Sequence, residues 1–388
     1  MAKVDAASAV NKRSSVFEGE VAGVTTPSGD TIVPKGGFYV PSLDGIRAIS
    51  FFLVFFAHAG LGKVFVPGGF GVTIFFLLSG FLITTLLRLE YLRFKRISLK
   101  DFYLRRVLRI LPPLYVTLAL SMLLVTLGKV ATGTPFWGTL SQALQYANYY
   151  QIYAESPVAM PGTGVFWSLA VEEHFYLLFP LFYVWMCPRF TSMRQALVLL
   201  MLCALALAWR CLLFFHFHSS FDRIYLATDT RFDSILLGCI LAIAASPVLR
   251  DPLYELLVRQ MRWLVPVSLA VLIATFLYRS DAFRSTFRYT LQGVALMPLL
   301  IAAIRFQGSW AVKILNLAWV RFLGVLSYSL YLCHSIILEA IGRVWAAGPV
   351  FTGVAGISGA LIFATLVHYL VERPCTRARK RLSRVQSN

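Results

Sequence analysis

Two side chains able to move protons lie inside apolar stretches of the sequence. His58 lies in the run LDGIRAISFFLVFFAHAG, and Glu172 lies in FWSLAVEEHFYLLFP beside Glu173 and His174. A neutral imidazole accepts a proton near pH 7, so a histidine in such a position is a candidate general base. The alternative for His58 is a hydrogen-bonded histidine that contributes only to packing.

A carboxylate at the same depth could orient the imidazole of this base. Arg47 precedes His58 by eleven residues, which is about 16 Å along a helix, so we expect Arg47 near the cytoplasmic end and His58 toward the outer end. A helix entering from outside near Val165 places Glu172 about 10 Å inside, at a matching depth. We predict that Glu172 orients His58. The alternative is an interhelical hydrogen bond that only holds the helices together.

Arginines at one helix start are candidates for phosphate binding. Arg105, Arg106 and Arg109 occur in DFYLRRVLRILPP, where positions 105 and 109, and also 106 and 109, share a helix face. Guanidinium groups bind phosphate oxygens with two parallel hydrogen bonds. Charge alone also fits a topology signal or a contact with lipid headgroups.

A fourth group of polar residues could line a cleft for an acceptor. Arg231 and Asp233 occur in TDTRFDSILLG, and Tyr328, Tyr331 and His334 occur in LSYSLYLCH. Each fits equally well as a hydrogen-bonded polar group in the interior of the bundle. The sequence contains no phosphate-binding P-loop, GxSxG or HExxH motif, and its six cysteines have no zinc-site spacing. We therefore expect no metal.

The composition indicates which elements position these groups. Of 388 residues, 58% are hydrophobic and 14% are charged, against about 25% charged in an average soluble domain. Mean hydropathy is +0.71, and a soluble globule of this size could not bury so much apolar surface. The sequence predicts an all-α, polytopic membrane protein. Apolar segments near 46–62, 70–87, 110–128, 165–187, 195–215, 232–248, 263–279, 289–304, 322–342 and 350–372 predict about ten transmembrane helices.

The net charge of +18 indicates membrane topology rather than nucleic-acid binding, because the basic residues fall between the apolar segments. Clusters at 88–109 and 373–384 belong in the cytoplasm, and an even number of helices then places both termini there. Residues 1–38 are polar and predict a disordered tail. A transmembrane domain follows over 39–374, and residues 375–388 form a basic tail. Glycines near the second segment, such as Gly80, favour close helix packing.

Five motifs in order resemble the acyltransferase-3 family of integral membrane O-acyltransferases, typified by bacterial O-antigen acetylases. An arginine, ten residues and a histidine match Arg47 to His58, and the GVxxFFxLSGFLI run matches 71–83. The FxxRRxxRIxP run matches 102–112, WSLxxExxFY matches 167–176, and SYxLYLxH matches 327–334. The resemblance extends over about residues 39–374.

The resemblance implies a multi-pass protein of the bacterial inner membrane that uses acyl-CoA, with acetyl-CoA the family default, as a cytoplasmic co-substrate. It implies a hydroxyl of a carbohydrate or lipid-linked glycan as acceptor. It assigns catalysis to His58 and Glu172. We expect donor binding by Arg47, Arg105, Arg106 and Arg109, and substrate contacts from Trp167, Ser168, Tyr176, Arg231, Asp233, Tyr331 and His334. The residues alone also fit a proton-coupled transporter of an anionic or glycan substrate, and a homo-oligomer remains open.

Overall fold

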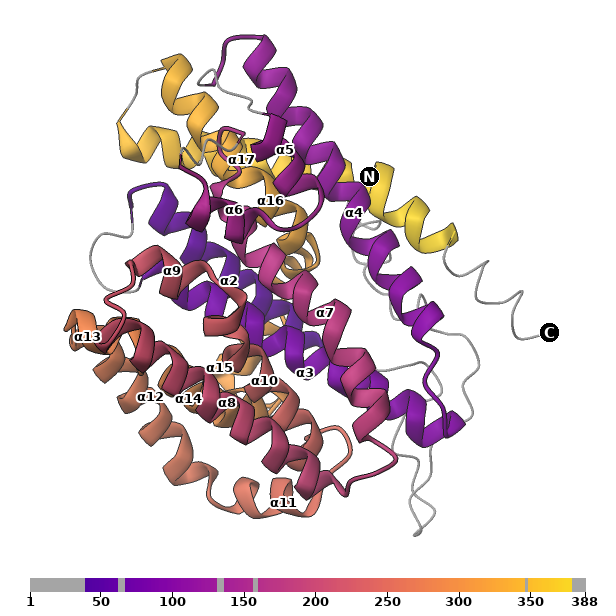
Figure 1. Cartoon of the computed structure of the whole chain (residues 1–388). Coiled ribbons are helices and arrows are strands. Elements are labelled where there is room, and N and C mark those ends of the chain that lie inside the picture. The colour runs from indigo at the N-terminus through magenta and orange to yellow at the C-terminus, as the bar shows by residue number, and fades with distance from the viewer. Residues whose placement is uncertain (1–38, 62–66, 131–135, 156–159, 346–347, 379–388) are drawn as a thin grey trace.

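The computed structural model describes residues 39–61, 67–130, 136–155, 160–345 and 348–378 (Figure 1). Within these ranges the secondary structure is helical and no strand occurs. The long helices are α2 (Pro41–His58), α3 (Gly68–Phe94), α4 (Leu99–Thr126), α7 (Trp167–Met186), α8 (Ser192–Phe215), α10 (Thr228–Ala244), α12 (Met261–Leu277), α14 (Arg288–Arg305), α16 (Ala318–Trp345) and α17 (Pro349–Val367). The predicted tail at 1–38 and residues 379–388 lie outside the described ranges.

Each of the ten apolar segments expected from the sequence corresponds to one of these long helices, which confirms the all-α membrane bundle. In the described part of the chain, 6 helices are long and apolar enough to cross a membrane, or up to 7 if the bent pair of α11 (Pro252–Arg259) and α12 counts as one span. Among the other long helices, α10 and α12 have 17 residues each, and α2 and α14 have 18 residues with charged groups such as Asp44 and Arg288 near their starts. The count of ten membrane-spanning helices stays a prediction.

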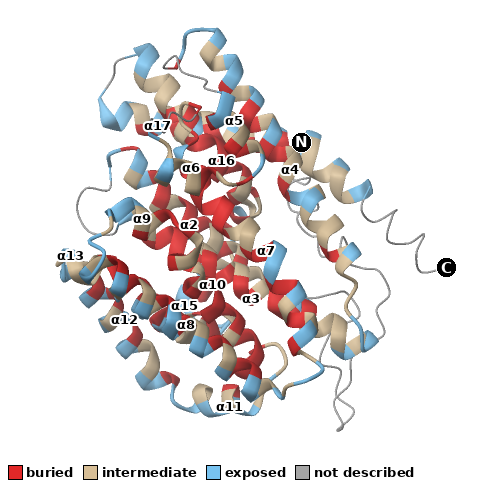
Figure 2. Cartoon of the chain, viewed as in Figure 1, coloured by how far each residue is buried: buried red, intermediate tan, exposed pale blue. Residues whose placement is uncertain are grey.

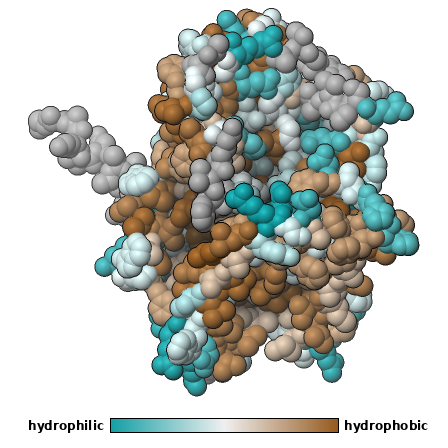
Figure 3. Space-filling view, turned by 90° about the vertical axis from the view of Figure 1, so that its left-hand side faces the viewer, coloured by the Kyte–Doolittle hydropathy of each residue, from teal (hydrophilic) through white to brown (hydrophobic). Residues whose placement is uncertain are grey.

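The centre of the bundle is formed by α2, α3, α10 and α16, which pack against one another and carry many of the buried residues (Figure 2). In the most apolar part of α3, 78% of residues are buried inside the protein, against 28% in α8 and α17. Apolar side chains therefore cover much of the outer surface, as one face of the molecule shows (Figure 3). Lipid chains are the environment in which such a surface is stable.

Helices α2 and α16 run side by side in the same direction, and a glycine makes their close approach possible. A Cβ atom at Gly324 would lie 1.9 Å from the carbonyl oxygen of Asp44. Near the other end of the pair, the rings of His58 and His334 meet. The pairing of these two helices therefore determines which residues surround the predicted base.

Helices α3 and α10 approach each other through two glycines. A Cβ atom at Gly80 would lie 1.9 Å from the carbonyl oxygen of Ile235, and one at Gly238 would lie 2.0 Å from that of Leu77. This confirms the close packing expected at Gly80, since any side chain there would displace backbone atoms.

Shorter helices lie between the long ones: α5 (Phe136–Ala143), α6 (Ala147–Tyr153), α9 (Phe221–Leu226), α13 (Asp281–Ser285) and α15 (Trp310–Leu315), with a 3-10 turn at Gly164–Phe166 and a π-helical turn at His368–Glu372. Near the start of α10, Asp229 accepts hydrogen bonds from Tyr149 of α6 (3.3 Å) and Trp209 of α8 (2.7 Å). Burial, and then the charge of Asp229, raises the pKa of the Tyr149 hydroxyl. We call the end of the bundle at which α2 ends the His58 end. The opposite end, formed by residues 88–109, is called the arginine-rich end.

Candidate active site

A pair of histidines lies at the end of α2. Nδ1 of His58 is 2.9 Å from Nε2 of His334. His58 is the last residue of α2 and is exposed, whereas His334 is fully buried in α16. The rings of Phe51 and Phe55 lie 5.7 Å and 6.4 Å from that of His334. Nδ1 of His334 is 2.8 Å from the backbone carbonyl oxygen of Tyr331, so both nitrogens of the buried ring have partners.

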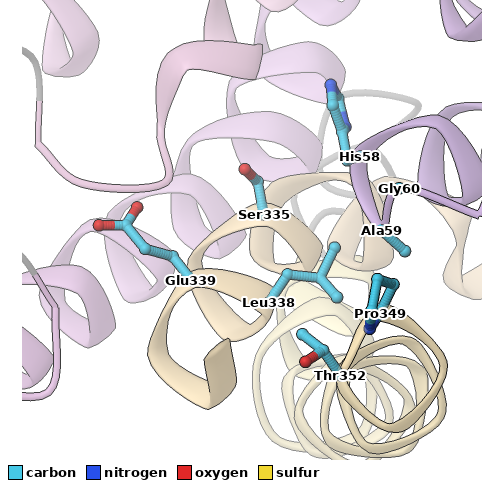
Figure 4. A pocket seen from close by; sticks show the side chains of 8 residues that line it. All are labelled: His58, Ala59, Gly60, Ser335, Leu338, Glu339, Pro349 and Thr352. Atoms are coloured by element: carbon cyan, nitrogen blue, oxygen red, sulfur yellow. The ribbon is translucent and has the colours of Figure 1, made fainter. Parts of the chain in front are cut away.

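The histidine pair borders an open cavity of about 450 Å³. Its lining combines polar and apolar residues from three segments: His58, Ala59, Gly60, Ser335, Leu338, Glu339, Pro349 and Thr352 (Figure 4). Ser335 and Glu339 stand one turn apart on α16, directly after His334 in the chain. A cavity of this volume is within the range of small-molecule sites, and its hydroxyl and carboxylate groups can hydrogen-bond a polar ligand.

The start of α7 is joined to the histidine pair through a tyrosine. Oγ of Ser168 is 2.7 Å from the hydroxyl of Tyr331, and that hydroxyl donates to the carbonyl oxygen of Val165 at 3.2 Å. The same tyrosine offers its carbonyl oxygen to His334. Three residues expected from the sequence to contact substrate, Ser168, Tyr331 and His334, are thus brought together beside His58.

Glu172 lies one turn farther along α7 and has partners other than His58. Oε1 accepts a hydrogen bond from Ser79 of α3 at 2.7 Å, and Oε2 accepts one from Tyr176 at 3.1 Å. The predicted pairing of Glu172 with His58 is therefore not formed. The reason is the difference in depth: Ser168 contacts Tyr331, which precedes His334 by three residues on α16, and Glu172 lies four residues, about 6 Å, farther along α7.

Two arginines provide positive charge near Glu172. Arg47 and Arg106 both act electrostatically on its carboxylate. Nε of Arg47 donates to Oγ of Ser327 at 3.1 Å. The guanidinium of Arg106 lies 5.1 Å from the ring centre of Tyr176. The interior of the bundle thus contains a group of opposite charges between its two ends.

The three arginines of α4 face different surroundings. While Arg106 points into the bundle, Arg105 forms a salt bridge with Glu90 at 3.2 Å and its side chain is 40% exposed. Arg109 is exposed and acts electrostatically on Asp44 and Glu372. The expected single cluster of three guanidinium groups is therefore spread over neighbouring faces of α4.

Asp233 forms a buried ion pair rather than facing a cleft. Its carboxylate accepts two hydrogen bonds from Arg210 of α8, at 2.9 Å and 2.8 Å, and one from Thr290 of α14 at 2.6 Å. Both side chains of the ion pair are 0% exposed. The described structure thus gives Asp233 the hydrogen-bonded interior position that was the alternative expectation.

Arg231 is enclosed by aromatic rings. Its guanidinium lies 3.8 Å from the ring centre of Tyr289 and 5.1 Å from that of Tyr225, with Phe76 and Trp167 farther out. The residue is fully buried, and NH2 donates to Thr73 at 3.4 Å. Attraction between a cation and aromatic faces stabilises this charge away from water.

Sequence reasoning missed three features. An arginine in the apolar run ALAWRCLLFF of α8 is costly in a membrane, and this cost was a signal that Arg210 needs an acidic partner. Ser335 and Glu339 follow the SYxLYLxH run and are four residues apart, so they share one helix face. This spacing was a signal for a polar face beside His334. The partnership of His58 and His334 had no local signal, since it depends on how two distant helices pack.

The fold and the site define a helical membrane protein with an exposed histidine at a cavity lined by both polar and apolar residues. The family model of the acyltransferase domain called Acyl_transf_3 matches residues 40–372, and the chain belongs to this family. O-acetyltransferase OatA of Staphylococcus aureus strain NCTC 8325 / PS 47 is 30% identical over 357 residues, which cover 87% of this chain and 57% of that protein. OatA of strain MRSA252 matches to the same extent. The chain thus spans just over half the length of these relatives. No solved structure matches it significantly.

Proposed function

We propose that this protein is an O-acetyltransferase of the bacterial inner membrane, which transfers an acetyl group from acetyl-CoA to a hydroxyl group of a carbohydrate or lipid-linked glycan. The observation that carries the proposal is the exposed His58 at the edge of a cavity that contains hydroxyl and carboxylate groups, in a chain of the acyltransferase family whose relatives are named O-acetyltransferases. The His58 end faces the outside, and the arginine-rich end and both termini face the cytoplasm.

The cavity beside His58 is the proposed acceptor site. A sugar offers several hydroxyl groups, and Ser335, Glu339 and Thr352 place hydroxyl and carboxylate oxygens around the space that His58 borders. Because a carboxylate accepts hydrogen bonds from several hydroxyls, Glu339 favours a neutral, polyhydroxylated acceptor over an anionic one.

The arginine-rich end is the proposed donor site. Arg105 and Arg109, which reach the surface of α4, and the interior Arg106 offer guanidinium groups to the phosphates of acetyl-CoA. The long pantetheine arm then extends past Arg47 and Glu172 toward His58. The separation of the two sites along the bundle suits a donor and an acceptor on opposite sides of a membrane.

The proposed reaction uses His58 as general base. His58 removes the proton from the acceptor hydroxyl, the hydroxyl oxygen forms a bond to the carbonyl carbon of the thioester, and the carbon–sulfur bond breaks. CoA leaves as a thiolate and takes the proton from His58. Base assistance of this kind accelerates a reaction by about 10²–10⁴-fold.

The test is transfer of radiolabel from acetyl-CoA to surface glycans in membranes that contain the wild type or His58→Ala. We expect label in a glycan with the wild type only, at equal amounts of inserted protein. Full transfer by His58→Ala would refute the role of the base. Transport of a glycan by proteoliposomes that transfer no acetyl group would favour a transporter instead.

A further inference from the structure

The hydrogen bonds of His334 determine which nitrogen of His58 can act as a base. His334 is enclosed by Phe51, Phe55 and the ring of Tyr331, and none of its surface is exposed. An apolar, water-free surrounding favours the neutral imidazole, which has one N–H group and one lone pair.

The position of the N–H group on His334 follows from its backbone partner. Nδ1 is 2.8 Å from the carbonyl oxygen of Tyr331, and a carbonyl oxygen only accepts hydrogen bonds. The proton of His334 is therefore on Nδ1, and its Nε2 has the lone pair. Since Nε2 is 2.9 Å from Nδ1 of His58, it is Nδ1 of His58 that donates.

We infer that His334 is a positioning residue that holds His58 in the Nδ1–H tautomer, so that the lone pair of His58 is on Nε2, on the side of the ring away from α16. A free neutral histidine favours the opposite tautomer, with its proton on Nε2. Without a hydrogen-bond acceptor at position 334, the basic nitrogen of His58 would be Nδ1, which faces the buried position 334, instead of Nε2 on the opposite side of the ring. His334 therefore takes the place that a carboxylate has in a catalytic triad, with no negative charge.

Two substitutions separate this role from simple packing. In His334→Gln, the amide reaches the former position of Nε2, and its oxygen can accept the proton of His58 Nδ1. In His334→Asn, the shorter amide reaches the former position of Nδ1, near the carbonyl oxygen of Tyr331, and no longer reaches His58. Both variants are polar, uncharged and smaller than histidine; because asparagine leaves the larger void at this buried position, the midpoint of thermal unfolding is measured for both.

The first experiment measures the tautomer directly, and it needs no substrate. Long-range ¹H–¹⁵N correlation NMR spectra are recorded on the ¹⁵N-histidine-labelled protein in detergent, at a pH where His58 is neutral. The signals of His58 are assigned by their loss in His58→Gln. We expect the pattern of an Nδ1–H imidazole in the wild type and in His334→Gln, and an Nε2–H imidazole in His334→Asn. An Nε2–H pattern for His58 in the wild type would overturn the inference.

The second experiment measures the consequence for catalysis, which rests on the proposed function. We expect His334→Gln to keep most of the wild-type kcat for acetyl transfer, and His334→Asn to lose about 100-fold in kcat, within the range of a lost general base. The KM for acetyl-CoA is expected to stay within about twofold in both, because His334 lies far from the arginine-rich end. Equal losses in kcat for the two variants would refute a positioning role.

Failure of the inference and failure of the proposed function are distinguishable. Diethyl pyrocarbonate acylates the unprotonated nitrogen of an accessible imidazole, and mass spectrometry follows its reaction at His58, with the exposed His216 and His218 as internal references. Slower modification of His58 in His334→Asn than in His334→Gln supports the tautomer even if no acetyl transfer is found. Equal rates in the wild type and both variants contradict it, whatever the reaction of the protein.

Discussion

The ion pair of Arg210 and Asp233 leads to a sharp prediction about stability. We expect Asp233→Asn to destabilise the protein by about 3–5 kcal/mol, because it leaves the charge of Arg210 buried without a counter-ion. The structure supports the upper part of this range. Both side chains are fully buried, and the carboxylate accepts two hydrogen bonds from the guanidinium and a third from Thr290.

The measurement is the midpoint of thermal unfolding in detergent, followed by the loss of the monodisperse peak in size-exclusion chromatography. A loss of about 3–5 kcal/mol corresponds to a decrease of roughly 5–10 °C or more for a domain of a few hundred residues. Arg210→Met should cost a similar amount. The double variant Arg210→Met with Asp233→Leu removes both charges, so we expect it to recover most of the lost stability.

The result also decides between two roles for Asp233. If Asp233 bound the acceptor substrate, Asp233→Asn would raise the KM for that substrate and leave the midpoint of thermal unfolding unchanged. If Asp233→Asn unfolds within about 1 °C of the wild type, or if the double variant is no more stable than either single one, the reasoning from burial and charge pairing is refuted.

Three further outcomes follow from the structure. Gly80→Ala should destabilise the bundle by about 1–3 kcal/mol, because its Cβ would meet the backbone of α10. The midpoint of thermal unfolding is compared with that of Gly308→Ala, a control at a position with open space around it. Equal midpoints for the two variants would contradict the prediction. Glu339→Gln should raise the KM for the acceptor substrate about fivefold without changing the KM for acetyl-CoA, because the neutral amide forms weaker hydrogen bonds to the substrate hydroxyls than the carboxylate does. Glu255→Gln on α11 is the control for the loss of one negative charge. An unchanged KM for the acceptor substrate would exclude Glu339 from the site. Arg106→Gln should weaken acetyl-CoA binding about tenfold or more; calorimetry on the purified protein measures this, and a larger effect of Arg105→Gln would show that the donor contacts the outer face of α4.

The helices were predictable because membrane insertion demands long apolar segments, and each such segment in the sequence became a helix. Their ends were less predictable. The segment expected at 110–128 begins at Leu99, since Ser98 caps the helix by accepting a hydrogen bond from the backbone N–H of Asp101. Polar helix starts of this kind carry no apolar signal.

The candidate site was predictable residue by residue, but its pairings were not. The positions of His58, Ser168, Tyr331 and His334 in the sequence marked them as candidates, and the structure brings them together. Which partner orients His58 depends on the rotation of α16 against α2, and no spacing within one helix contains that information. The expected depths of the two residues in the membrane favoured Glu172 as the partner of His58. In the structure the side chain of Glu172 is instead hydrogen-bonded to Ser79 of α3.

The bend between α11 and α12 has a consequence for how the protein sits in its membrane. The axes of the two helices differ by 81°, so if α12 crosses the bilayer, α11 lies almost flat along its surface. Leu256 is exposed on α11, while Leu253 and Leu257 pack against the core. A flat amphipathic helix with exposed leucine enters the headgroup region and resists vertical movement. It would hold the bundle at a constant depth relative to the leaflet in which α11 lies, so a change in bilayer thickness would instead change the distance from His58 to the headgroups of the opposite leaflet.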